Sequence, residues 1–155
     1  MSIHRELFEF ERGQAGAVLE QLATLADGSW MNIEPVIDET ELEDLRARTP
    51  HPILRIFSAR GRPIPFGTIV AAADGYSVGL EHGRGAPVVR ELRDVGVRAP
   101  SSWQQEQDHA RRGVVYTVPR DESPAALLDW LLDAATALSD VPIRGQWSAV
   151  VASPS

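Results

Sequence analysis

The sequence predicts an α+β fold in which a mixed, largely antiparallel sheet packs in two layers against two or three helices. Two observations support this class. The pair Asp74-Gly75 separates two runs rich in β-forming residues, which is a strong signal for a hairpin and therefore for antiparallel pairing. Amphipathic helical segments alternate with further runs of this kind, as expected when helices cover a sheet. The length of 155 residues indicates a single domain over residues 1–155.

The N-terminal third predicts two strands and two helices. Alternating apolar and acidic residues favour a strand over 5–11, and apolar residues three and four positions apart favour a helix over 14–26. Asp27-Gly28 follows that helix, and glycine readily takes the left-handed conformation beyond a helix end. A second strand is expected over 30–36. Leading acids and trailing arginines predict a short surface helix over 38–48, because this order complements the helix dipole.

The middle of the chain predicts three strands, one helix and a long connection. A compact apolar run indicates a strand over 53–58, and the hairpin strands extend over 66–73 and 76–82. A proline at the first position and a glycine after the end favour a short helix over 87–95. The polar residues over 97–112 predict an irregular connection that is longer than usual.

The C-terminal third predicts a strand, a helix and a final strand. The first strand is expected over 114–119. Ser123-Pro124 supplies a helix cap and a first helical residue in the preferred order, and the helix extends to about Leu138. The run over 146–152 alternates and closes the sheet as a strand.

Charge is unevenly distributed along the chain, whose net charge is −7 and whose fifteen basic residues are all Arg. This usage is typical of a bacterial genome rich in G and C. Residues 1–44 carry eleven acids and two Arg, whereas residues 45–120 carry six acids and twelve Arg. The sequence pI of about 5.0 disfavours nucleic-acid binding. The basic middle segment is suited to a small anion or to the acidic end of a second copy.

The composition excludes several kinds of chemistry. The chain has no Cys, so disulfides, thiol catalysis and zinc–thiolate sites are ruled out. None of the four His is spaced from another as in a known zinc motif, and we expect no metal and no cofactor. No apolar run is long enough to span a membrane and the first residues do not resemble a secretory signal, so we expect a cytoplasmic protein without membrane contacts.

The segment Gly75-Tyr76-Ser77-Val78-Gly79 fits the G-x-S-x-G pattern around the nucleophile of many serine hydrolases. That motif works only at a sharp turn from a strand into a helix. Here the residues after Ser77 continue a strand, and the next helix begins about ten residues later. We therefore interpret Ser77 as a hairpin residue.

The loop over 82–87 is the first candidate binding site. It leaves a strand and enters a helix, so free backbone N–H groups and a forked Arg side chain favour phosphate, sulfate or a carboxylate. The candidate anion ligands are His82, Gly83, Arg84 and Gly85, with Arg112 from a later loop. The alternative is that the two glycines only permit a tight connection between strand and helix.

The segment over 108–112 is the second candidate. A His beside an acid is suited to general-base catalysis near neutral pH, and two Arg are suited to holding an anionic substrate. His109 is therefore a candidate catalytic residue together with His82, which also follows a predicted strand. The alternative, which the sequence favours, is a solvated structural loop.

The helix that ends at Leu138 is apolar over an arc of about 200°, roughly twice that of an ordinary surface helix. Such a helix must contact more than one layer. One interpretation places a sheet on one side and another helix of the same chain, such as 14–26, on the other. The other interpretation is a homodimer interface with Trp130 as the central anchor. The interface residues are then Leu127, Trp130, Leu131, Ala134 and Leu138.

Two functions of different classes follow from these patterns. The first is a non-enzymatic module that acts through protein contacts, including a homodimer, because no catalytic signature is present and the charges are segregated. The second is a small-anion-binding protein or hydrolase-like enzyme that uses the loop over 82–87 with His109 and Arg112. The two functions differ in whether His82, Arg84, His109 and Arg112 converge on one pocket.

Overall fold

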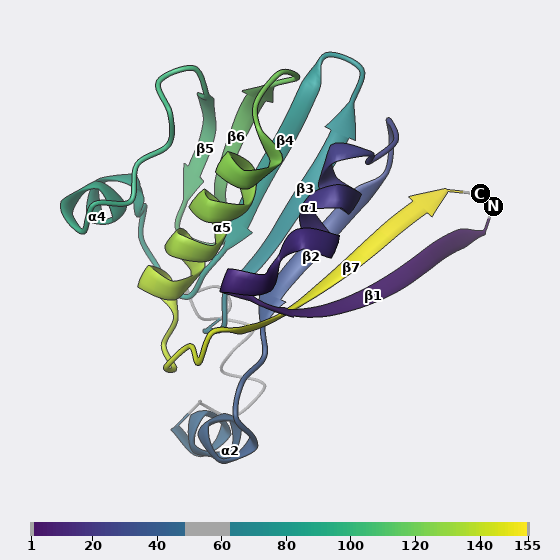
Figure 1. The fold of residues 1–155 in the computed structure, drawn as a ribbon. Helices are drawn as coiled ribbons and strands as arrows, with labels where there is room; N and C mark the ends of the chain where they lie inside the picture. Colours follow the sequence, from purple (N-terminus) through teal and green to yellow (C-terminus); the bar gives the residue numbers. More distant parts are fainter. Residues whose placement is uncertain (1, 49–62, 155) are drawn as a thin grey trace.

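A computed structural model describes residues 2–48 and 63–154, and within them the chain forms one seven-stranded sheet (Figure 1). The order of the strands across the sheet is β1-β7-β2-β3-β4-β6-β5, and every neighbouring pair is antiparallel. The strands are β1 (Ile3–Glu11), β2 (Trp30–Pro35), β3 (Phe66–Ala72), β4 (Gly75–Glu81), β5 (Gln104–His109), β6 (Gly113–Pro119) and β7 (Gln146–Pro154). The α+β class is therefore confirmed.

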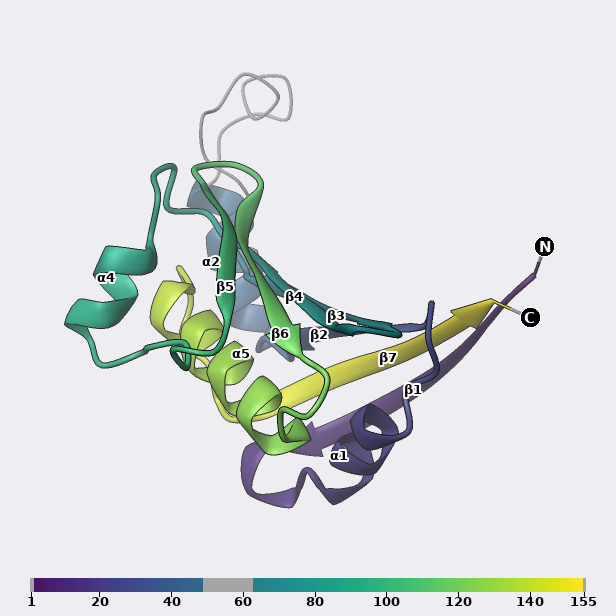
Figure 2. The ribbon, with the colours of Figure 1, turned by 90° about the horizontal axis from the view of Figure 1, so that it is seen from above.

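The helices lie beside this sheet. They are α1 (Gly16–Ala23), α2 (Glu39–Arg48), α4 (Val89–Asp94) and α5 (Pro124–Leu138), with a short 3-10 turn η1 (Arg12–Gln14) before α1. Helices α1 and α5 pack next to each other on the same face of the sheet (Figures 1 and 2). Helix α5 begins as expected, because the Ser123 hydroxyl accepts a hydrogen bond from the Ala126 N–H at 3.0 Å. In the part of the chain that is described, no helix is long and apolar enough to cross a membrane.

The expectation of a mixed sheet is wrong for the described strands, which pair only in the antiparallel sense. The units β1-α1-β2 and β6-α5-β7 do join strands that run the same way, as a helical crossover requires. However, β7 lies between β1 and β2, and three strands lie between β6 and β7. No two parallel strands therefore become neighbours.

The predicted hairpin is confirmed, since β3 pairs with β4. Its register joins Ala72 to Gly75, so the turn lies one residue earlier than expected. The four described helices match the predicted segments with somewhat shorter ends. Strand β5 replaces part of the irregular connection expected over 97–112. The strand expected over 53–58 lies outside the described residues.

The two faces of the sheet are different. One face is buried beneath α1 and α5 and carries core residues such as Ile69, Val78 and Tyr116. We call the other face the open face, because within residues 2–48 and 63–154 no helix packs across it (Figure 2). Helix α2 lies beyond the end of β2 instead (Figure 1). The exposed side chains of Leu7 and Val70 lie on this face.

Close packing between α5 and the sheet depends on a glycine in β3. A Cβ atom added to Gly67 would lie 2.6 Å from the Leu131 Cδ2, and the Leu131 side chain is buried. Such a distance is far inside van der Waals contact. The absence of a side chain at Gly67 therefore lets α5 approach β3 at this point.

We expect Gly67→Ala to lower the free energy of unfolding by roughly 1–3 kcal/mol, because the added methyl overpacks the contact with Leu131. The control is Gly13→Ala, since no atom lies within 4 Å of a Cβ at Gly13. Urea unfolding of both variants measures the difference. Equal stabilities would contradict the close approach of α5.

Candidate functional site

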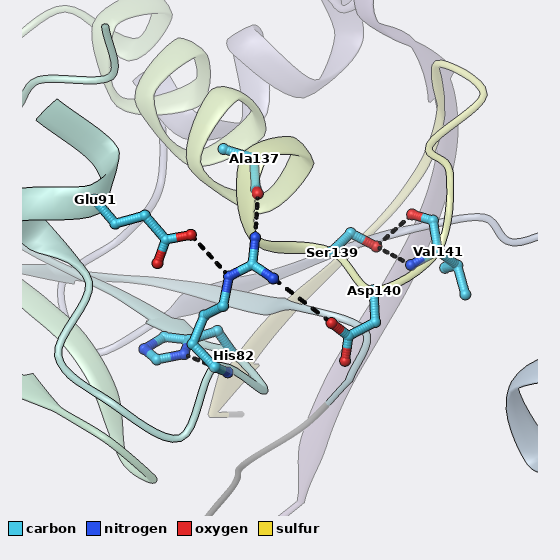
Figure 3. Close-up of polar contacts among 7 residues, drawn as sticks. His82, Glu91, Ala137, Ser139, Asp140 and Val141 are labelled. Carbon is cyan, nitrogen blue, oxygen red and sulfur yellow. Dashed lines mark hydrogen bonds and ion pairs between the residues drawn. The ribbon is translucent and has the colours of Figure 1, made fainter. Parts of the chain in front are cut away.

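The loop over 82–87 is held by contacts within the chain (Figure 3). The Arg84 Nη2 donates to the carbonyl of Ala137 at 2.9 Å, near the C-terminal end of α5. Its Nε lies 3.0 Å from the Glu91 Oε1 and its Nη1 lies 3.7 Å from the Asp140 Oδ1. The guanidinium therefore joins α5 to α4, and two carboxylates already neutralise its charge. This geometry supports the structural interpretation of the loop.

The start of α4 also receives an anion from the chain itself. The Asp108 carboxylate of β5 accepts the N–H groups of Val88 at 2.8 Å and Val89 at 3.1 Å. These groups belong to the helix terminus that was expected to bind an external anion. An internal carboxylate occupies that position, so these contacts do not support an anion site at His82, Gly83, Arg84, Gly85 and Arg112.

His82 follows β4 and is completely buried. Its Nδ1 accepts the Arg84 N–H at 3.2 Å, so the neutral ring carries its proton on Nε2, an atom for which the described residues offer no hydrogen-bond partner. Burial lowers the pKa of His82 from 6.5; the charges of Asp108 and Glu91 oppose this shift, and that of Arg84 adds to it. His82 is therefore a neutral, buried residue of the β4–α4 connection.

His109 organises the turn between β5 and β6. Its Nδ1 accepts the N–H groups of Arg111 at 3.0 Å and Arg112 at 3.1 Å. The Arg112 side chain is exposed. Two hollows, one beside Trp103 and one beside Ser77, have none of His82, Arg84, His109 and Arg112 in their walls. The four residues thus do not meet in either hollow.

The proposed interface residues of α5 lie inside the chain. Leu127, Trp130, Leu131, Ala134 and Leu138 are all buried. Trp130 makes edge-to-face contacts with Tyr116 at 5.3 Å and with Trp103 at 5.8 Å between ring centroids. Helix α1 packs beside α5, as the intrachain interpretation expected. The wide apolar arc is therefore covered by the same chain, and these five side chains offer a second copy almost no surface.

Exposed apolar side chains gather on the open face. Ile3 is 43% exposed, Leu7 61% and Val70 37%. The strand register places Leu7 beside Val150, and Trp30 beside Val70. We call these five residues the open-face patch. Sequence reasoning missed this patch, although the adjacent apolar residues Ile69 and Val70 indicate a strand that is apolar on both faces.

Acidic side chains border the open-face patch at one end. Glu9 and Glu34 both pair with Ser148 in the register, and Glu81 lies farther along the same face, where it pairs with Phe66. All three carboxylates are exposed. Arg5 pairs with Ala152 on the other side of Leu7. The arrangement is an apolar surface with an acidic border, which is suited to contact with a protein. Among residues 2–48 and 63–154, no three His, Asp or Glu side chains gather as metal ligands.

We expect Asp108→Ala to destabilise the fold by about 2 kcal/mol, because two N–H groups at the start of α4 lose a charged acceptor. Asp108→Asn keeps one acceptor oxygen and should lose less. Urea unfolding of the two variants gives the comparison. A stability of Asp108→Ala equal to that of the parent would show that water or another group caps α4.

The stability of the parent chain should fall as the pH is lowered below about 6.5, the pKa of an unfolded His. The folded pKa of His82 is lowered by burial, so the unfolded chain binds a proton more readily below that pH. His82→Asn keeps an acceptor for the Arg84 N–H but does not titrate. We expect its stability to fall less between pH 7.5 and 5.5, by up to about 1.4 kcal/mol per pH unit. Parallel pH profiles for the two proteins would refute this role of His82.

No protein-family model, curated protein or solved structure matches this chain.

Proposed function

We propose that this protein is a non-enzymatic binding module and that a basic partner protein docks on the open face of its sheet. The observation that carries the proposal is the open-face patch, whose apolar side chains lie exposed on a face that no helix of the described residues covers. Apolar groups that a partner removes from water contribute favourable binding free energy. This one face carries three of the most exposed large apolar residues, Ile3, Leu7 and Val70. Exposed apolar residues that are scattered singly over a surface are ordinary, whereas a group on one face indicates an interaction site.

The charge around the patch favours a basic partner. Glu9 and Glu34 border the apolar residues, Glu81 lies farther along the same face, and β1, β2 and the start of α2 belong to the segment 1–44 with its eleven acids and two Arg. Complementary charge steers association and rejects partners of like charge. A second copy brings the same acids to a symmetric contact. The expected homodimer therefore gains less on this face than a basic protein does.

The enzymatic alternative has weaker support. Arg84 is engaged by Glu91, Asp140 and the Ala137 carbonyl, and the Nδ1 atoms of His82 and His109 both accept backbone N–H groups. Neither His therefore offers Nδ1 as a general base, and neither lines a described hollow. The cytoplasmic location and the lack of a cofactor stay predictions from composition.

A photo-crosslinking amino acid at residue 7 tests the proposed partner surface. The matched control places the same group at residue 95, since Val95 is 63% exposed and Leu7 61% exposed, but Val95 lies off the open face. We expect irradiation in an extract of the native cell to give one defined adduct at position 7 that is absent at position 95. The protein crosslinked at position 7 should be basic.

Charge reversal makes the test specific. Glu34→Arg should reduce the yield of the adduct severalfold, because it places a positive charge where a basic partner docks. Glu20→Arg is the control, since Glu20 is an exposed acid on α1, away from the open face. An adduct between two copies of this chain would replace the proposal with self-association. A lack of adduct at position 7, or equal yields in both charge variants, would overturn it.

A further inference from the structure

A cavity of about 280 Å³ lies on the helix-bearing side of the sheet, between α4, the segment over 97–101 and the aromatic residues of β6 and α5. It is separate from the open-face patch and shares no residue with it. Its wall includes Arg93, Arg98, Trp103, Gln105, Tyr116 and Trp130. The volume is close to the lower limit for small-molecule sites, about 300 Å³, so a ligand of one or two rings fits its scale.

Three aromatic side chains line this cavity and hold each other in place. Trp103, Tyr116 and Trp130 contact one another edge to face, with ring centroids 5.3 to 5.9 Å apart. The Trp103 Nε1 also donates to the Glu122 Oε2 at 2.7 Å. Each ring is only 5–6% exposed, so a small part of each ring borders the cavity, and its position is fixed before a ligand arrives.

Two cationic groups stand at the mouth of the cavity. Arg93 and Arg98 are exposed, and neither guanidinium has an ion pair or hydrogen bond with the described residues, whereas the Arg84 guanidinium is bound by acids. No Asp or Glu is among the described residues that line the cavity, in a chain that has 22 acids. The cavity is therefore a locally basic site on an acidic protein.

Neutral donors complete the lining. The Tyr116 hydroxyl makes no hydrogen bond with the described residues, and Gln105 of β5 adds an amide. Burial raises the pKa of Tyr116, while the nearby charge of Arg93 lowers it and that of Asp108 raises it. The phenol is therefore a protonated donor near neutral pH, and the electrostatic influence of Arg93 reaches it.

We propose that this cavity binds a small aromatic carboxylate, whose ring contacts the exposed parts of Trp103, Tyr116 and Trp130 and whose carboxylate binds Arg93 and Arg98. Arginine is suited to this contact, because its planar fork binds both oxygens of a carboxylate. The aromatic rings select a flat ligand, and the arginines select a negative charge. This small-molecule site is independent of the docking of a partner protein on the open face.

Titration calorimetry with four compounds tests the proposal. Benzoate and indole-3-acetate combine a ring with a carboxylate, cyclohexanecarboxylate lacks the aromatic ring, and indole lacks the charge. We expect the two aromatic carboxylates to bind the parent chain at least about tenfold more tightly than either control, as a lost charge-assisted contact predicts. Lack of binding of both aromatic carboxylates at about 10 mM, or indole binding as tightly as indole-3-acetate, would overturn the proposal.

Two exposed substitutions locate the charge contact. Arg93→Met and Arg98→Met keep most of the apolar stem and remove the guanidinium, and each should weaken indole-3-acetate binding about tenfold or more. The matched control is Arg90→Met, because Arg90 is exposed on the same helix but does not line the cavity. Thermal unfolding of all three variants checks that the fold is intact. Equal affinities in all three variants would place the ligand elsewhere and refute the site.

Discussion

The contact between α5 and the sheet is the interaction on which the other parts of this structure depend. Eight apolar residues of α5 are buried, and Gly67 lets Leu131 reach the surface of β3. Trp130 also packs against Trp103, with 5.8 Å between the ring centroids. On the polar side of the helix, the Arg12 Nη1 lies 2.6 Å from the Asp133 Oδ1. A helix surrounded in this way cannot also present its apolar arc to a partner. The surfaces that remain for binding are those that α5 does not cover.

The end of α5 also explains why a loop with the composition of an anion site is structural. The last carbonyl groups of a helix lack partners within it, and Arg84 supplies one to Ala137. The same guanidinium lies between Glu91 and Asp140, while Asp108 fills the start of α4. Free N–H groups and an Arg beside two glycines are equally consistent with an external ligand and with an internal carboxylate. Only the contacts in the folded chain distinguish the two cases. The contact between Arg84 and Ala137, for example, joins residues that are 53 positions apart in the sequence.

The sequence predicted those elements whose signal is local. The helix ending at Leu138 and the hairpin around Asp74 depend on periodicity, caps and turn residues that are neighbours in the chain. Strand β5 was missed because its sequence, QQEQDH, has no apolar alternation; it is an edge strand whose pairing with β6 supplies the order. The place of β7 between β1 and β2 is a long-range pairing that no local pattern encodes. The open-face patch was missed for the same reason, since Leu7, Val150, Trp30 and Val70 come to one face of the sheet only through that strand order.

The fold determines where the acidic and basic segments of the chain lie on the molecule. The acidic segment contributes β1 and β2 to the sheet. The basic segment contributes β3, β4, β5 and β6, and also α4 and the cavity mouth with Arg93 and Arg98. A symmetric dimer through the open face would bring Glu9 and Glu34 against their own copies, which costs electrostatic free energy. Two copies with complementary charges would have to join the open face of one to the basic end of the other. Such a head-to-tail contact leaves an unused face on each outer copy and extends into a chain unless the rotation closes a ring. The proposed complex on the open face is therefore simplest with a different, basic protein.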